Sequence, residues 1–183
     1  MKSNCPLISV VVACWNVEKY IQNCLNSILT QTYANLEILV VDDCSTDSTL
    51  AILKTFEQKD ERIHVISRHK NGGLSECRNS GILAATGELL AFVDGDDALA
   101  PNTYEEIVKN YDPSIDVYWF GTKIVYEANK DLKTSDDQYY RIKNDGLHQI
   151  GRNALLDYDC SACNKVFKRA LVEKEYFFFE SFL

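Results

Sequence analysis

Hydrophobic residues in the first part of this 183-residue chain follow two alternating patterns. Short continuous apolar runs, rich in Val, Ile and Leu, are typical of strands with both faces buried. Between these runs, apolar residues recur at the three- and four-residue spacing of amphipathic helices. The patterns predict strands at Leu7–Ala13, Leu36–Val41, Ile63–Ile66 and Leu89–Val93, with helices at Val17–Leu29, after Asp47 and at Leu74–Ala85. Asn16 can cap the first of these helices.

Strict alternation of strand and helix favours parallel strands joined by right-handed crossovers. We therefore predict an α/β fold with a mostly parallel central sheet and helices on both faces. The second part of the chain is less regular, although Pro101 suits the first turn of a helix. There we expect a helix at Pro101–Asn110, a strand at Val117–Phe120, an exposed hairpin or loop at Glu127–Gln138, a helix at Leu147–Tyr158 and a short strand at Lys165–Phe167.

The net charge of −8 restricts the possible partners. Non-specific binding to nucleic acid or to an anionic membrane needs a basic surface, so we expect neither. A ligand that carries phosphate would then need a local metal ion. No apolar run reaches the roughly 20 residues of a transmembrane span, and residues 1–4 lead into a strand rather than a signal peptide, which favours a cytoplasmic protein.

The seven cysteines are odd in number and mostly lie in apolar segments, which favours reduced, buried thiols over a disulfide framework. Cys160 and Cys163 form a C-x-x-C pair. With no second pair and only three histidines, packing is favoured over a structural zinc site. The chain is apolar up to its last residue, whereas C-termini are usually polar, so we expect a fragment of a longer protein.

The strand at Leu89–Val93 ends in three acids, Asp94, Asp96 and Asp97, with Gly95 among them. Ligands of open α/β sheets usually bind at this carboxyl edge. Crowded carboxylates repel one another, and a divalent cation between them would remove the repulsion. Oxygen donors suit Mg²⁺ or Mn²⁺, and a glycine allows close approach of a ligand. The alternative is a helix N-terminus whose dipole favours acidic residues.

Three other strand ends carry side chains that suit a nucleotide. Trp15 offers a face for a base, and a carboxylate of Asp42 or Asp43 can accept a hydrogen bond from the ring N–H of uracil. Asn71 and Arg78 follow the third strand, where Arg78 would place a cation near phosphate or base. The structural alternatives are a core position for Trp15, helix capping by the two acids and a surface ion pair for Arg78. These structural alternatives do not explain why the candidate residues of all four strands are expected at one edge of the sheet.

Two common nucleotide sites are excluded by the glycine pattern. A dinucleotide site needs G-x-G-x-x-G after the first strand, where this chain has Cys14-Trp15-Asn16-Val17. A phosphate loop of the form G-x-x-x-x-G-K-S/T is also absent from the sequence.

Several motifs occur in a fixed order between Pro6 and Asp97. They are Ile8–Val12 with Asn16, Gln31–Tyr33, Val41–Asp47, Asn71–Ser75 with Arg78, Asn79 and Gly81, and Thr86–Glu88 followed by Asp94–Asp97. Together they resemble glycosyltransferase family 2, whose members have the GT-A fold. The resemblance is dense in this part of the chain and looser beyond it.

The resemblance implies a UDP-sugar donor bound with Mn²⁺ or Mg²⁺. By this resemblance Asp43 would hold the uracil, Asp94 the ribose or a metal-bound water, and Asp96 the cation that bridges the diphosphate. Asp96 and Asp94 are therefore the expected metal residues. The other residues expected to bind the donor nucleotide are Ala13, Trp15, Asn71, Arg78 and Gly95.

Family members often have Pro, Tyr and Gly at the positions of Ala13, Trp15 and Cys44. Small residues at 13 and 44 and an aromatic residue at 15 should preserve donor binding. In related polysaccharide-making members, a segment like Cys163–Arg169 is soon followed by a Glu-Asp pair that contains the general base. The chain stops before such a pair, and Asp157 and Asp159 fit the pattern poorly, so no catalytic residue is assigned.

We predict one GT-A domain over residues 1–183, with a nucleotide-binding half at 1–97 and an incomplete acceptor-side half at 98–183. The predicted enzyme is a metal-dependent inverting transferase that moves a hexosyl or N-acetylhexosaminyl group from a UDP-sugar to a glycan or lipid-linked glycan. The resemblance suggests polysaccharide assembly at the inner face of a bacterial membrane, with peripheral association. The alternatives are a nucleotidyltransferase and a non-catalytic sugar-nucleotide-binding module.

Overall fold

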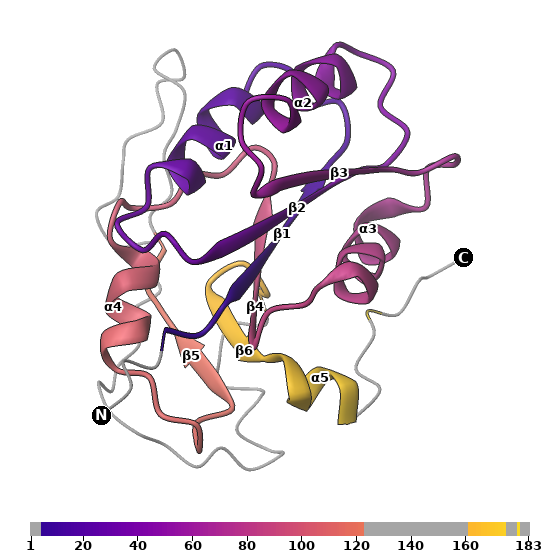
Figure 1. Cartoon of the computed structure of the whole chain (residues 1–183). Helices are drawn as coiled ribbons and strands as arrows, with labels where there is room; N and C mark the ends of the chain where they lie inside the picture. The colour runs from indigo at the N-terminus through magenta and orange to yellow at the C-terminus, as the bar shows by residue number, and fades with distance from the viewer. Residues whose placement is uncertain (1–4, 123–160, 175–178, 180–183) are drawn as a thin grey trace, which may run out of the picture.

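The computed structural model describes residues 5–122, 161–174 and 179. In these ranges six strands form one sheet in the order β3-β2-β1-β4-β6-β5, with helices on both sides (Figure 1). The strands are β1 (Ile8–Cys14), β2 (Leu36–Asp42), β3 (Ile63–Ser67), β4 (Leu89–Asp94), β5 (Val117–Trp119) and β6 (Lys165–Lys168). The helices are α1 (Ile21–Leu29), α2 (Thr49–Glu57), α3 (Gly73–Ala84), α4 (Thr103–Lys109) and α5 (Arg169–Lys174).

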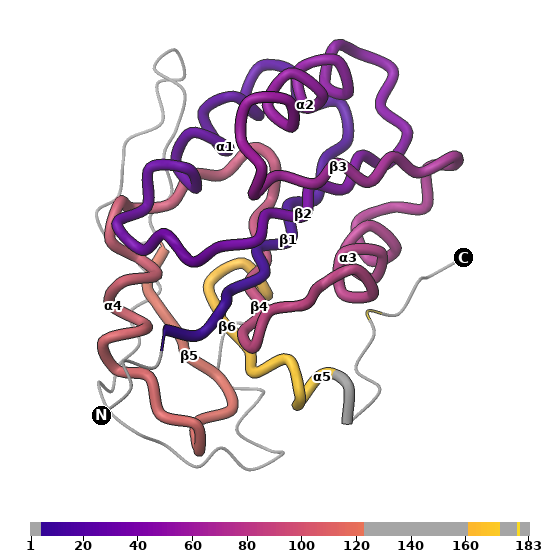
Figure 2. Tube along the Cα trace, in the orientation of Figure 1, coloured from indigo at the N-terminus to yellow at the C-terminus, as the bar shows by residue number. Residues whose placement is uncertain are grey.

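The first four strands are parallel, as the alternating sequence pattern predicts. β1 pairs with β2 on one side and with β4 on the other, and β3 pairs with β2. β6 is antiparallel to both β4 and β5, so a late part of the chain enters the sheet between two earlier strands. Figure 2 shows β6, in yellow, beside the pink β4. The structure confirms the predicted mostly parallel α/β sheet.

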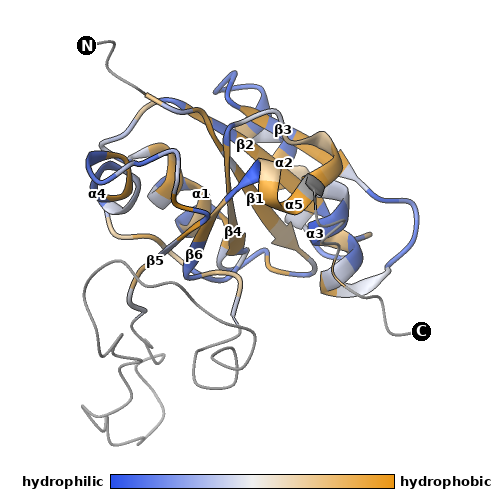
Figure 3. Cartoon of the chain, turned by 90° about the horizontal axis from the view of Figure 1, so that it is seen from below, coloured by the Kyte–Doolittle hydropathy of each residue, from blue (hydrophilic) through white to orange (hydrophobic). Residues whose placement is uncertain are grey.

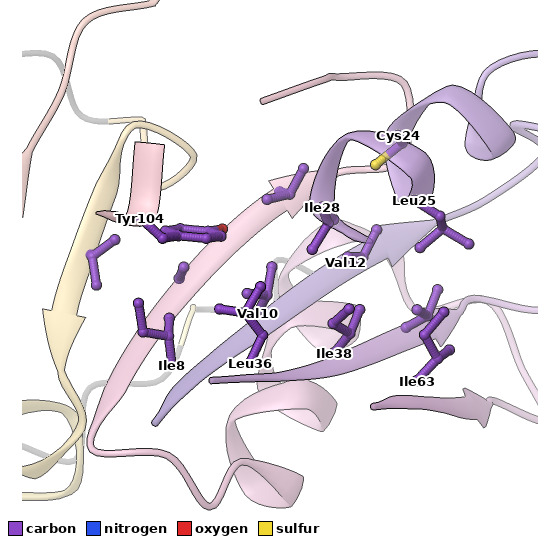
Figure 4. Close-up of a cluster of buried hydrophobic side chains, with 14 of the residues drawn as sticks. Ile8, Val10, Val12, Cys24, Leu25, Ile28, Leu36, Ile38, Ile63 and Tyr104 are labelled. Atoms are coloured by element: carbon purple, nitrogen blue, oxygen red, sulfur yellow. The ribbon is translucent and has the colours of Figure 1, made fainter. Parts of the chain in front are cut away.

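The sheet separates two apolar layers. On one face, Val10 and Val12 of β1 belong to a buried cluster with Ile28 of α1, Leu53 of α2 and Tyr104 of α4. Figure 4 shows several of these side chains between the strands and α1. The other face packs against α3 and α5 through a second cluster. In Figure 3 the central strands are largely orange, as expected for strands buried on both sides.

Several element boundaries differ from the sequence prediction. α1 begins at Ile21 rather than Val17, because Asn16 does not cap it: the Asn16 side chain accepts hydrogen bonds from the backbone of the loop after β2. α4 is shorter than predicted, β5 ends at Trp119, and the six-residue helix α5 was not predicted. The hairpin predicted at 127–138 and the helix predicted at 147–158 lie outside the described residues.

No helix in the described ranges combines the length and apolar character needed to cross a membrane.

Helix α3 lies unusually close to the central strand at Gly81. A Cβ atom at this position would come within 3.0 Å of the Cβ of Val11 and still closer to its methyl groups. The absence of a side chain at 81 therefore sets the distance between α3 and β1. Because Arg78 lies one turn earlier on the same helix, this distance also sets how far Arg78 extends over the sheet edge.

We expect Gly81→Ala to lower the free energy of unfolding by about 1–3 kcal/mol, because the new methyl group overpacks a buried contact. Urea denaturation followed by circular dichroism measures the change. Gly121→Ala is the matched control, since nothing lies within 4 Å of a Cβ atom there. Equal stability of the two variants would contradict the close contact of α3 with β1.

Candidate functional site

The register of the sheet aligns the carboxyl ends of its central strands. Ala13 of β1 pairs with Asp94 of β4, and Cys14 pairs with Asp42 of β2. The pairing continues just beyond the strands: the backbone N–H of Gly95 donates to the Ala13 carbonyl at 2.9 Å, and that of Asp43 donates to the Cys14 carbonyl at 2.8 Å. The loops after β2 and β4 are therefore held on either side of the end of β1.

Trp15 lies directly after β1 and is 56% exposed, so it is not a core residue. Its loop is tied to the loop after β2. The side-chain oxygen of Asn16 accepts a hydrogen bond from the Thr46 N–H at 2.8 Å, and the Asn16 N–H donates to the Ser45 hydroxyl at 3.0 Å. An exposed indole on a loop fixed in this way is available to a planar ligand.

Asp43 is buried and already has hydrogen-bond donors around it. Its carboxylate accepts the backbone N–H of Gly73 at 2.7 Å and that of Gly72 at 3.1 Å, and it forms an ion pair with Arg68 at 3.5 Å. Asp43 thus caps α3, whereas capping of the next helix along the chain was the alternative that its sequence position suggested. A uracil N–H would have to share this carboxylate with α3.

Asp42 has a different environment from its neighbour. One of its carboxylate oxygens accepts the Ser45 N–H at 3.3 Å. The other is buried and has no hydrogen-bond partner among the described residues. Since Asp42 is only 1% exposed, Asp43 remains the better candidate for contact with a ligand beyond the strand end.

Arg78 and Asp94 form an ion pair at the same edge. The Nη2 of Arg78 lies 2.9 Å from the Oδ1 of Asp94, and the arginine side chain is only 12% exposed. The same nitrogen donates to the Cys163 sulfur at 3.3 Å. This pair is therefore not the exposed surface contact that was the alternative for Arg78.

Asp94, Asp97 and Cys163 form a group of possible metal ligands, with ligand atoms within 4.8 Å of one another. Burial and the charges of Asp96 and Asp94 raise the pKa of the Asp97 carboxyl. Such crowding of carboxylates fits a hard divalent cation, which would relieve it. Asp96 is exposed and lies outside this group.

Cys163 is a poor ligand for such a cation as it stands. Burial, followed by the charge of Asp94, raises the pKa of its thiol to about 12. Hard divalent cations prefer carboxylate oxygen to sulfur, which suits softer metals. The carboxylates are therefore the donors that fit Mg²⁺ or Mn²⁺ here.

The remaining predicted residues lie at the same edge but differ in exposure. Ala13 is buried in the apolar layer beneath α3. Asn71 is exposed and immediately precedes Gly72, which donates to Asp43. Gly95 is buried, and a Cβ there would approach the Cys14 sulfur and the Ala13 carbonyl to 3.0 and 3.1 Å. The roles of all these residues in donor binding stay predictions.

Sequence reasoning missed four residues that contact this set. Arg68 directly follows β3, and its position at a strand end was a signal that could have been used. Asp97 was noted among the acids but not selected. Cys163 and Phe179 contact Arg78 from far along the chain. Cys163 was noted in the C-x-x-C pair and in the family-like segment, but neither pattern indicates a contact with Arg78, and no local pattern marks Phe179.

Comparison with solved structures identifies the class of fold. The chain superimposes on Staphylococcus aureus TarS 1-349 in complex with UDP-GlcNAc with a TM-score of 0.73 and 28% identity, covering 94% of this chain and 48% of TarS 1-349. The mannosyltransferase PcManGT from Pyrobaculum calidifontis, in complex with GDP-Man and Mn²⁺, gives a TM-score of 0.57 and 27% identity over 61% of this chain and 34% of that one. The fold is therefore that of a GT-A glycosyltransferase.

The family follows from the sequence. The sequence model of Glycosyl transferase family 2 matches residues 9–175, so the chain belongs to glycosyltransferase family 2. An uncharacterized glycosyltransferase of Haemophilus influenzae is 35% identical over 176 residues, which cover 94% of this chain and 54% of the relative. The chain thus spans about half the length of this relative and of TarS 1-349.

Cys44, in the loop after β2, provides a test of the local backbone. Its φ of 62° lies in the left-handed region, and its side chain is exposed. We expect Cys44→Gly to raise the free energy of unfolding by about 0.5–1 kcal/mol, because glycine adopts this conformation without steric cost. Cys44→Ser keeps a Cβ atom and should leave stability within a few tenths of a kcal/mol. Chemical denaturation of both variants measures the difference, and a destabilised glycine variant would contradict the prediction.

Proposed function

We propose that this chain supplies the donor-binding part of a metal-dependent inverting glycosyltransferase that uses a UDP-sugar. The observation that carries the proposal is the meeting of exposed Trp15, buried Asp43 and the Arg78–Asp94 ion pair at one edge of the sheet. The solved TarS complex, which contains UDP-GlcNAc, supports uracil as the base and an N-acetylhexosaminyl group as the sugar that is transferred, with a hexosyl group as the alternative.

Each residue has a distinct task in this proposal. The Trp15 face stacks on the uracil, and the Asp43 carboxylate accepts its ring N–H. Arg78 places a fixed positive charge beside the diphosphate, where a guanidinium can bond two oxygens at once. Gly95 lets the loop after β4 pack closely against the end of β1, where a side chain would not fit without a shift.

Asp94 and Asp96 would hold the cation, with Asp97 adjacent to them. When bound, a divalent cation neutralises negative charge on the departing nucleoside diphosphate. The structure containing Mn²⁺ and GDP-Man supports this choice of metal. An acceptor hydroxyl, deprotonated by a carboxylate, would attack the anomeric carbon from the opposite face and invert it. No residue is assigned as that base.

We propose a glycan or lipid-linked glycan as the acceptor, on the family resemblance alone. Residues 1–97 would bind the nucleotide and residues 98–183 would belong to the acceptor side. β6 supports this division, because it extends the sheet beyond β4, on the side of β4 away from Trp15 and Asp43. Assembly of polysaccharide at the inner face of a bacterial membrane is part of the same proposal.

Removal of a proposed metal residue gives the first test. We expect UDP to bind more tightly with Mn²⁺ than without it, and Asp96→Ala to weaken binding in Mn²⁺ by about tenfold or more. Isothermal titration calorimetry measures both. Asp97→Asn, measured in the same way, tests whether Mn²⁺-dependent binding of UDP also needs the carboxylate of Asp97, which belongs to the group with Asp94 and Cys163.

Glu61→Gln is the matched control for loss of one negative charge, since Glu61 is exposed and lies before β3, at the opposite end of the strand from the site. It should bind UDP like the wild type. Binding that is indifferent to Mn²⁺ in every variant would instead favour a non-catalytic sugar-nucleotide-binding module.

Base recognition gives the second test. We expect Asp43→Asn to reduce the preference for UDP over CDP by about tenfold, because the charged acceptor for the uracil ring N–H is lost and cytosine carries no proton on that ring nitrogen. The ratio of the two dissociation constants is the measurement, since Asp43 also caps α3 and any loss of stability affects both nucleotides alike. An unchanged ratio would remove the role proposed for Asp43.

A further inference from the structure

Arg78 is held by residues from three separate parts of the chain. Asp94 binds its Nη2 from the end of β4, and Cys163 accepts from the same nitrogen just before β6. The ring of Phe179, which follows α5, lies 5.1 Å from the guanidinium carbon. The first two contacts are polar and lie at the proposed donor site. The third has no evident role in the tasks described so far.

Phe179 is itself fixed to α3. The side chain of Asn79 makes two hydrogen bonds with its backbone: the Phe179 N–H donates to Oδ1 at 2.8 Å, and Nδ2 donates to the Phe179 carbonyl at 2.9 Å. The ring also meets Phe92 of β4 edge to face, with centroids 5.3 Å apart and an interplanar angle of 86°. Backbone and ring are thus held by two different elements, α3 and β4.

This arrangement restricts the arginine more than the ion pair does alone. Both polar contacts are made by the same nitrogen, Nη2, so the guanidinium plane can still rotate about it, whereas a ring within cation–π distance limits the positions that the plane can take. The Nε of Arg78 is buried and has no hydrogen-bond partner among the described residues. Since that donor does not orient the side chain, the contact with Phe179 contributes a larger share of the restraint.

We propose that Phe179, anchored by Asn79, is a positioning residue that holds Arg78 ready for the diphosphate of the donor. This inference rests on the proposed function, because it gives Arg78 a phosphate to bind. A guanidinium that is already oriented loses less conformational entropy when the anion arrives. The contact therefore acts on donor affinity through Arg78 and needs no direct contact between Phe179 and the nucleotide.

A double-mutant cycle tests this route. Phe179→Leu keeps an apolar side chain but removes the ring, and we expect it to weaken UDP binding in Mn²⁺ by about fivefold. Arg78→Gln should weaken it by about tenfold, because the positive charge and the paired donors for two phosphate oxygens are removed. If Phe179 acts through Arg78, the double variant binds no more weakly than Arg78→Gln alone, since glutamine has no charge for the ring to hold.

Two further variants separate positioning from packing. Phe179→Tyr keeps the aromatic face and should bind UDP within about twofold of the wild type. Phe167→Leu removes another ring that contacts Phe92, with centroids 6.0 Å apart, and lies in β6. It should lower the unfolding midpoint while leaving UDP affinity unchanged.

The outcomes distinguish this inference from the function on which it rests. Additive effects of Phe179→Leu and Arg78→Gln on UDP affinity, or an equal loss in Phe167→Leu, would overturn the role of Phe179 and leave the proposed function intact. Failure of the wild-type chain to bind UDP with or without Mn²⁺ would overturn the proposed function, and the nucleotide role of Phe179 with it.

Discussion

The register of β1 between β2 and β4 is the constraint on which the site depends. All seven residues of β1 are buried, and both of its edges are paired in parallel. A slip of one residue would move every side chain of the shifted strand to the other face of the sheet. With the register fixed, Asp43 and Gly95 lie on either side of the end of β1, and the polar groups of three strands reach one edge. Apolar packing inside the sheet thus determines where the charges outside it lie.

The first four strands and three helices could be predicted because their signals are local. Buried parallel strands are continuous apolar runs, and the helices between them show helical spacing. Some errors in the predicted element boundaries arise where a contact with a residue far along the chain determines the local structure. Asn16 looked like a helix cap, but its side chain bonds Thr46, thirty residues later in the chain. Helix α5 has only six residues, which is too short for a periodic pattern.

Part of the candidate site could be predicted for a similar reason. Trp15, Asp43 and Asp94 each follow a recognisable strand, so their common edge follows from the parallel topology. Their immediate partners could not be predicted in this way, because Cys163 and Phe179 reach Arg78 from the far end of the chain. The contact of Asp43 with α3 was also hidden, since only coordinates show that its carboxylate accepts the Gly73 N–H. Sequence motifs pointed to the candidate residues, and long-range contacts define how tightly each of them is held.

The place of β6 in the sheet has a consequence for biosynthesis. β6 begins at Lys165 and inserts between β4, which ends at Asp94, and β5, which ends at Trp119. While the ribosome is still translating the chain between β4 and β6, the edge of β4 that pairs with β6 in the folded protein has no strand beside it. Unpaired edges invite pairing with other chains, and β4 is apolar along most of its length. Until β6 has been synthesised, the nascent polypeptide therefore presents an apolar strand with an unpaired edge.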